Sequence, residues 1–286
     1  MSQLPFDSPP RAREAERGGA TVQTERAPAG GVSPPAASEA IKQVLKLVVA
    51  YDGTEFHGFA AQPNTRTIAG VLSEAMGRVL RAEVELSCAG RTDTGVHARG
   101  QVVSCPVEAD VDLDVVVRAV NAQLGPEVVV RAAELVDSSF DARRSACWRS
   151  YRYTIVNRPA PDPFLSRYAW WVPELLDLSR LRLASDPFIG EHDFSTFCRK
   201  GPEGSTAKRR VFDSAWHDDG DDVLRFDIRA TAFCWQMVRS IVGTLVDVGI
   251  GKLRPGDILH ILRACDRAAA GRLAPPEGLC LWEVGY

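Results

Sequence analysis

The order of apolar segments between residues 44 and 135 constrains the fold of this 286-residue chain more than any other feature. Two stretches, 68–80 and 112–124, carry apolar residues at helical spacing. Apolar runs typical of strands lie at 44–51, 84–88, 102–105 and 128–135. The order strand, helix, strand, strand, helix, strand is that of a ferredoxin-like unit, in which an antiparallel sheet carries helices on one face. The sequence therefore predicts an α+β fold.

The second half of the chain repeats this arrangement loosely. Strands are predicted at 150–157, 208–217, 223–231 and 279–284, and helices at 178–185, 233–248 and 257–265. Two such units, joined near Phe140, would form a cleft between their sheets. We therefore divide the chain into an N-terminal tail (1–42), an N-terminal α+β unit (43–140) and a C-terminal α+β unit (141–286).

The N-terminal tail is rich in Pro, Ala, Gly, Ser, Arg and Glu and has almost no large apolar residues. Such a segment buries too little apolar surface to offset its ordering entropy, so we expect it to be disordered. It lacks the charged start and apolar run of a secretory signal. No apolar run in the chain is long enough to span a membrane.

The chain contains 7 cysteines, and none of them are spaced as Cys-x-x-Cys. Most lie in an apolar context. Together with their odd number, this predicts reduced, buried thiols and a cytoplasmic protein rather than a zinc site.

The net charge of −3 does not indicate a nucleic-acid-binding protein. If RNA is the substrate, basic side chains must be gathered locally instead of being in excess. Two groups of basic residues are candidates, and a solvated surface run is the alternative for each. The first group is Arg143, Arg144, Arg149 and Arg152, and the second is Arg199, Lys200, Lys208, Arg209 and Arg210.

A polar loop at 89–98 separates the apolar runs at 84–88 and 102–105. It places the carboxylate of Asp93 between the cation of Arg91 and the imidazole of His97. Loops carry chemistry because a rigid scaffold can present their side chains to a ligand. On local chemistry alone, however, an aspartate in such a loop is more often a turn or cap residue.

Several blocks, in the same order along the chain, resemble the TruA family of tRNA pseudouridine synthases. The polar loop is similar to the signature loop of this family. Further similar blocks lie at 51–59, 140–153, 190–197, 237–243 and 274–279. The resemblance implies the pseudouridine synthase fold, with two α+β units around a central cleft. It also implies an isomerase that converts uridine to pseudouridine at positions 38 to 40 of the tRNA anticodon stem-loop.

The resemblance implies roles for individual residues. Asp93 matches the nucleophile of the family, and Tyr151 matches a tyrosine that stacks on the target base and relays a proton. Tyr153, on the same face of its strand, is the alternative for that position. Leu279 would form part of the pocket wall. Arg91 would hold the flipped nucleotide, since extracting a base from its stack costs energy that a cation can offset; capping of nearby carbonyls is its alternative.

Arg239 is the only cation in the predicted helix at 233–248, which is apolar on nearly every face. A buried guanidinium without a partner is strongly destabilising, so a carboxylate partner is expected. The residues alone do not identify this carboxylate, and the pair could be purely structural. The resemblance identifies it as Asp93, which Arg239 would keep ionised.

The implied reaction breaks one glycosidic bond and forms another, so it requires no cofactor. His97, His192 and Asp193 lack the clustering of a metal site, so none is predicted. The expected partners are tRNA and a second copy of the chain in a homodimer, with no membrane. Two alternatives are a catalytically inactive RNA-binding protein of the same fold and a metal-dependent hydrolase that uses His97, His192 and Asp93.

Overall fold

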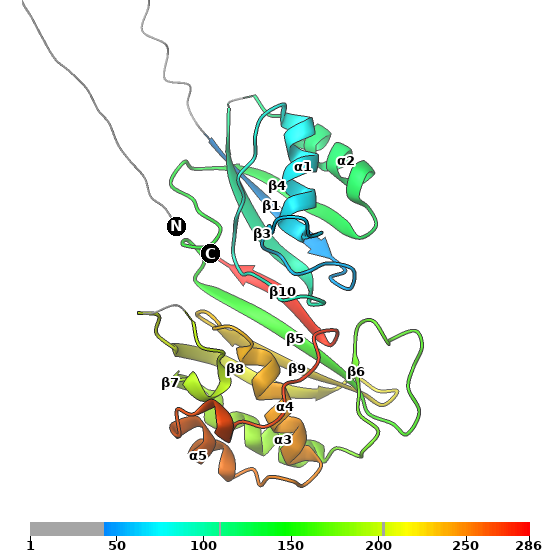
Figure 1. Ribbon diagram of the computed structural model, residues 1–286, viewed down its shortest axis with the longest axis vertical. Helices are drawn as coiled ribbons and strands as arrows, with labels where there is room; N and C mark the ends of the chain where they lie inside the picture. Colours follow the sequence, from blue (N-terminus) through cyan, green and yellow to red (C-terminus); the bar gives the residue numbers. More distant parts are fainter. Residues whose placement is uncertain (1–42, 109, 202–203) are drawn as a thin grey trace, which may run out of the picture. The chain divides into compact units, whose positions relative to one another are not determined.

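The structure is a computed structural model that describes residues 43–108, 110–201 and 204–286 (Figure 1). The predicted α+β class is confirmed. The strands of the sheet follow the order β4-β1-β3-β10-β5-β9-β8-β7, with β2 paired to β3 and β6 paired to β5. The predicted disordered tail at 1–42 lies outside the described residues. None of the described helices is long and apolar enough to cross a membrane.

The first part of the sheet follows the predicted order of elements. It contains β1 (Gln43–Tyr51), α1 (Ile68–Leu80), β2 (Ser87–Cys88), β3 (His97–Val107), α2 (Leu113–Leu124) and β4 (Val128–Val136). α1 begins where the Thr67 side chain accepts a hydrogen bond from the Gly70 backbone, and α2 begins after Asp112, which caps it in the same way. Because each cap satisfies an otherwise free N–H group, both helices begin at or next to the predicted residue.

The remaining elements follow along the chain. They are β5 (Trp148–Val156), β6 (Trp170–Trp171), α3 (Leu178–Ser185), β7 (Gly190–Asp193), β8 (Lys208–Asp218), β9 (Val223–Ala230), α4 (Met237–Gly249), α5 (Asp257–Arg263) and β10 (Leu279–Gly285). Short 3-10 helices occupy Asp186–Phe188, Ser195–Phe197 and Arg267–Ala269. Every residue of α4 except Arg239 is buried, as its apolar sequence predicts.

The C-terminal strand β10 joins the two parts of the sheet (Figure 1). Leu281 of β10 pairs with Ala98 of β3 in parallel and with Tyr151 of β5 in antiparallel orientation. One sheet therefore continues from β4 to β7. This arrangement places β3, at whose beginning the polar loop ends, one strand away from β5, with β10 between them.

Several predicted boundaries were wrong, and two of these bear on the site. The strand predicted to stop at Cys105 runs from His97 to Val107, because a proline such as Pro106 removes one N–H donor without requiring the strand to end. The helix predicted at 233–248 begins only at Met237. Gln236 has a φ of 64°, a left-handed conformation that cannot continue a right-handed helix.

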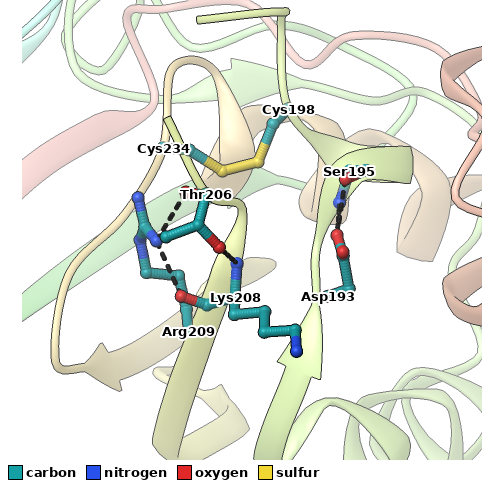
Figure 2. The surroundings of a disulfide bond; sticks show 7 residues. All are labelled: Asp193, Ser195, Cys198, Thr206, Lys208, Arg209 and Cys234. Carbon is teal, nitrogen blue, oxygen red and sulfur yellow. Dashed lines mark hydrogen bonds between the residues drawn. A yellow bond between two sulfur atoms is a disulfide. The ribbon is translucent and has the colours of Figure 1, made fainter. Parts of the chain in front are cut away.

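The prediction that all thiols are reduced was wrong for one pair. Cys198 and Cys234 lie 36 positions apart, and their Cα atoms are 5.7 Å apart and joined through a disulfide (Figure 2). The spacing gave no signal, because the fold alone brings the segment after Ser195–Phe197 against the segment before α4. Cys88 and Cys105 are buried free thiols, as predicted, but the free thiols of Cys147 and Cys265 are exposed, so the prediction of burial was wrong for them.

Candidate active site

A cavity of about 840 Å³ is bounded by the polar loop, β5, the residues that precede and begin α4, and one residue of β10. The sequence elements that form it lie far apart in the chain. All five candidate site residues line it: Arg91, Asp93, Tyr151, Arg239 and Leu279. We call it the arginine-lined cavity.

Positive charge dominates the wall of this cavity. Within the described parts of the chain, its lining contains a single acidic residue, Asp93, and six arginines: Arg91, Arg143, Arg149, Arg199, Arg209 and Arg239. The local gathering of basic groups that an RNA substrate would require is therefore present in a chain whose net charge is −3.

The two predicted basic groups contribute only in part. Arg144, Arg152, Lys200, Lys208 and Arg210 are not among the lining residues. Arg152 follows Tyr151 on β5 and points to the opposite face of the sheet, where its Nε donates to Asp227 at 2.9 Å. Arg209 does line the cavity, and its Nη1 donates to the carbonyls of Thr206 and Lys208, near the disulfide (Figure 2).

Arg239 and Asp93 form an ion pair across 146 positions of sequence. The Nη1 atom of Arg239 lies 3.5 Å from Oδ2 of Asp93, and its Nε donates to the carbonyl of Ala274 at 2.7 Å. The side chain of Arg239 is 12% exposed and that of Asp93 is 26% exposed. The carboxylate is thus oriented by a largely buried cation and remains open to the cavity.

Close packing fixes the backbone around Asp93. The Phe59 N–H donates to the carbonyl of Thr92 at 3.0 Å, and the Thr92 hydroxyl lies 2.8 Å from the hydroxyl of Tyr51. Gly58 has a φ of +86°, and a Cβ at this position would lie 2.8 Å from the carbonyl oxygen of Thr92. Only glycine allows this approach, which brings the turn after β1 against the polar loop.

Two buried polar residues that the sequence interpretation missed hold the beginning of the polar loop. The fully buried Gln101 side chain donates to the carbonyl of Gly90 at 2.6 Å and accepts from its N–H at 3.3 Å. Arg149, assigned from sequence only to a basic group, is 9% exposed and donates twice to the carbonyl of Ala89. A polar residue inside an apolar strand was the available signal for Gln101.

Tyr151, and not Tyr153, faces the cavity. The Tyr153 hydroxyl donates to the carbonyl of Pro275 at 2.7 Å, and Tyr153 does not line the cavity. The Tyr151 ring packs edge-on against Phe233, with centroids 5.0 Å apart. Burial and, secondly, the negative charge of Asp93 raise the pKa of Tyr151 well above its ordinary value. Tyr151 is therefore a neutral phenol that can donate a hydrogen bond.

The histidines considered as metal ligands lie in separate places. The His97 Nδ1 accepts a hydrogen bond from the Gly53 backbone at 3.0 Å, and the His192 Nε2 lies 3.0 Å from the carbonyl of Ile189. Among the residues that the structure describes, no group of three or more His, Cys, Asp or Glu side chains is placed to hold a metal ion.

Acidification is expected to destabilise the fold through His97. Burial lowers the pKa of His97 below its ordinary value of about 6.5. The unfolded chain therefore binds this proton more readily than the folded chain. The contribution of neutral His97 to the free energy of unfolding is fully present above about pH 6.5 and is lost as the pH falls through the folded-state pKa. The free energy of unfolding, measured with urea between about pH 5 and pH 8, should depend less steeply on pH in His97→Asn than in the wild type. His192→Asn, the control, should match the wild type, and an unchanged slope in His97→Asn would contradict the assignment.

The chain is similar to known proteins over most of its length. A family model described as tRNA pseudouridine synthase matches residues 47–143 and 184–286, which include Asp93 and Arg239. The tRNA pseudouridine synthase A of Brevibacillus brevis is 42% identical over 242 residues, covering 85% of this chain and 99% of that protein. The proteins of the same name from Leifsonia xyli and Pseudothermotoga lettingae are 40% and 38% identical, covering 85% and 84% of this chain and 91% and 98% of their own lengths.

Proposed function

The chain belongs to the tRNA pseudouridine synthase family, an isomerase family, and we propose that it converts uridine to pseudouridine at positions 38 to 40 of the tRNA anticodon stem-loop. One observation carries the proposal. Among the residues that the structure describes, Asp93 is the only carboxylate in a cavity lined by six arginines, and the guanidinium of Arg239 lies 3.5 Å from it. The cavity thus combines one nucleophilic group with a lining suited to a polyanion.

The proposed reaction rearranges the substrate without adding or removing atoms. The bond between N1 of the base and C1′ of the ribose breaks, the base rotates in the cavity, and C5 bonds to C1′. The proton leaves C5 and N1 gains one, so no oxidant, reductant or cofactor is consumed. Asp93 acts as the nucleophile: its carboxylate oxygen bonds to the nucleotide, and this bond breaks again before the product leaves, which divides one difficult step into two easier ones.

The other candidate residues have supporting roles in this proposal. Arg239 orients the carboxylate of Asp93 through their ion pair. Tyr151 stacks on the target base, and its protonated hydroxyl can take part in proton transfer. Leu279 forms an apolar part of the wall. Arg91, which is exposed, contacts the flipped nucleotide.

A direct test is to incubate the protein with unmodified tRNA transcripts and map pseudouridine by carbodiimide labelling and mass spectrometry. We expect product at positions 38 to 40 and loss of that product when the uridines there are replaced by cytidines. tRNA binding without any product would favour the alternative, an inactive RNA-binding protein of the same fold. Product only at other positions would overturn the proposed site of modification.

Removing Arg239 should impair isomerisation while the fold is retained. Arg239→Met loses the charge that orients Asp93, and we expect kcat to fall by roughly 100- to 1000-fold, as when one electrostatic contact at a reacting centre is deleted. Arg239→Lys should recover part of the rate, because lysine keeps the charge but lacks the planar fork. Single-turnover rates measure this effect. Arg152→Met, which removes a guanidinium paired outside the cavity, is the control, and equal rates in all variants would exclude the proposed role.

We propose further that the protein is cytoplasmic and works as a homodimer in which one tRNA contacts both subunits. A single cavity of about 840 Å³ accommodates only a few nucleotides, so most of the tRNA must lie outside it. Light scattering after size exclusion should give twice the chain mass of 31.2 kDa. A monomer with full activity would contradict this part of the proposal.

A further inference from the structure

An exposed aromatic side chain lies at the wall of the arginine-lined cavity. Trp235 is 47% exposed and lines the cavity. Because Gln236 has a left-handed φ of 64°, α4 begins only at Met237, and Trp235 is not part of its buried surface. Trp235 is therefore exposed on the wall of the cavity, where a ligand that occupies the cavity can contact its ring.

Three interactions between residues 198–199 and residues 234–235 fix the position of this ring. The Cζ atom of Arg199 lies 4.0 Å from the centroid of the Trp235 ring. The Arg199 N–H donates to the carbonyl of Trp235 at 2.9 Å. One residue earlier on each segment, Cys198 and Cys234 form the disulfide (Figure 2). The ring is therefore held in place before any ligand arrives, which lowers the entropy cost of binding.

In the part of the chain that the structure describes, the guanidinium of Arg199 makes no hydrogen bond or ion pair, so its donors are available there. Among the described residues, no carboxylate pairs with it, and it also lines the cavity. An arginine stacked on an aromatic ring presents N–H groups at its edge, a geometry that suits a phosphate oxygen. Aromatic rings beside cationic groups are the usual platforms for unpaired bases, and they accept any base because every base has a π-face.

We propose that Trp235 and Arg199 form a platform for a nucleotide adjacent to the target uridine. The target base occupies the part of the cavity at Asp93, a neighbouring base stacks on the Trp235 ring, and Arg199 contacts a phosphate of the same strand. This inference rests on the proposed function and adds to it a contact that positions the substrate strand. It predicts an effect on substrate binding that is larger than the effect on the chemical step.

The first test compares Trp235→Ala, Trp235→Phe and the wild type on an intact tRNA transcript. Loss of one stacked base is expected to raise KM by roughly 5- to 100-fold, with little change in kcat. Trp235→Phe keeps a ring and should recover most of this loss. Trp171→Ala is the matched control, because Trp171 is 41% exposed and does not line the cavity. A KM equal to that of the wild type in Trp235→Ala would overturn the platform.

The second test separates stacking from a structural role. Substrates carry one abasic nucleotide, placed on either the 5′ or the 3′ side of the target uridine. With the wild-type protein, one of the two abasic substrates should raise KM about as much as Trp235→Ala raises it on intact tRNA. When Trp235→Ala is assayed on that same abasic substrate, KM should rise little further. If the KM effects of the abasic nucleotide and of Trp235→Ala instead multiply, the ring and the neighbouring base do not contact each other, and the platform is overturned. If the wild type forms no pseudouridine on intact tRNA, the proposed function itself fails, and this outcome is distinct from failure of the platform.

Discussion

The variant Asp93→Asn is expected to form no measurable pseudouridine while it continues to bind tRNA. Asparagine occupies nearly the same volume, so the polar loop keeps its contacts with Gly58, Phe59 and Tyr51. It lacks the negative charge and nucleophilicity of a carboxylate, and the rate should fall on the order of 10⁴-fold or more. The six arginines of the cavity remain, so binding of the polyanionic substrate is preserved.

Single-turnover assays on a tRNA transcript, together with filter binding, measure both parts of this prediction. Asp114→Asn is a suitable control, because Asp114 is an exposed residue of α2 outside the arginine-lined cavity. It should have the wild-type rate. An Asp93→Asn protein that retains a substantial fraction of the rate would show that the carboxylate is not the nucleophile.

The largest loss of stability is expected for Arg149→Met. The Arg149 guanidinium donates to four backbone carbonyls, those of Ala89, Arg143, Ala146 and Thr231. It thereby connects the polar loop, the segment before β5 and the end of β9. Methionine fills part of the space but has no donor, and each buried carbonyl that loses its partner costs about 1–3 kcal/mol.

Burial lowers the pKa of Arg149, which means that keeping this charge away from water costs free energy. The substitution removes the buried charge, and this offsets part of the cost of the lost hydrogen bonds. We expect a net loss of about 3 kcal/mol or more in the free energy of unfolding. Urea unfolding of Arg149→Met, Arg149→Lys and the control Arg144→Met measures it. Lysine, with three donors, should give an intermediate value, and Arg144→Met should be unchanged because Arg144 is exposed. A free energy of unfolding equal to that of the wild type in Arg149→Met would contradict the prediction, because it would mean that water satisfies the four carbonyls as well as the guanidinium does.

Local patterns were sufficient to predict most of the regular elements, but not the short strands β6 and β7. α1 and α3 begin and end at the predicted residues, because helical spacing of apolar side chains and a capping side chain just before each helix are properties of short stretches. The polar loop was recognisable for the same reason. Its glycines and threonines between two apolar runs indicate a turn whatever the rest of the chain does.

Contacts between distant segments were not predictable in this way. Nothing in the sequence of β10 indicates that it lies between β3 and β5, and nothing in the spacing of Cys198 and Cys234 indicates that they meet. The composition of α4 predicted a carboxylate partner for Arg239 but not which one. That assignment came from the family resemblance. In the structure the carboxylate of Asp93 does contact the Arg239 guanidinium, although the two residues are 146 positions apart in sequence.

The proposed covalent step is tested most directly by stopping wild-type turnover with denaturant and analysing the peptide that contains Asp93 by mass spectrometry. The proposal predicts a fraction of this peptide with the added mass of the substrate nucleotide, bonded to Asp93, and no such species from Asp93→Asn. An adduct on a different residue, together with product formation by Asp93→Asn, would contradict it.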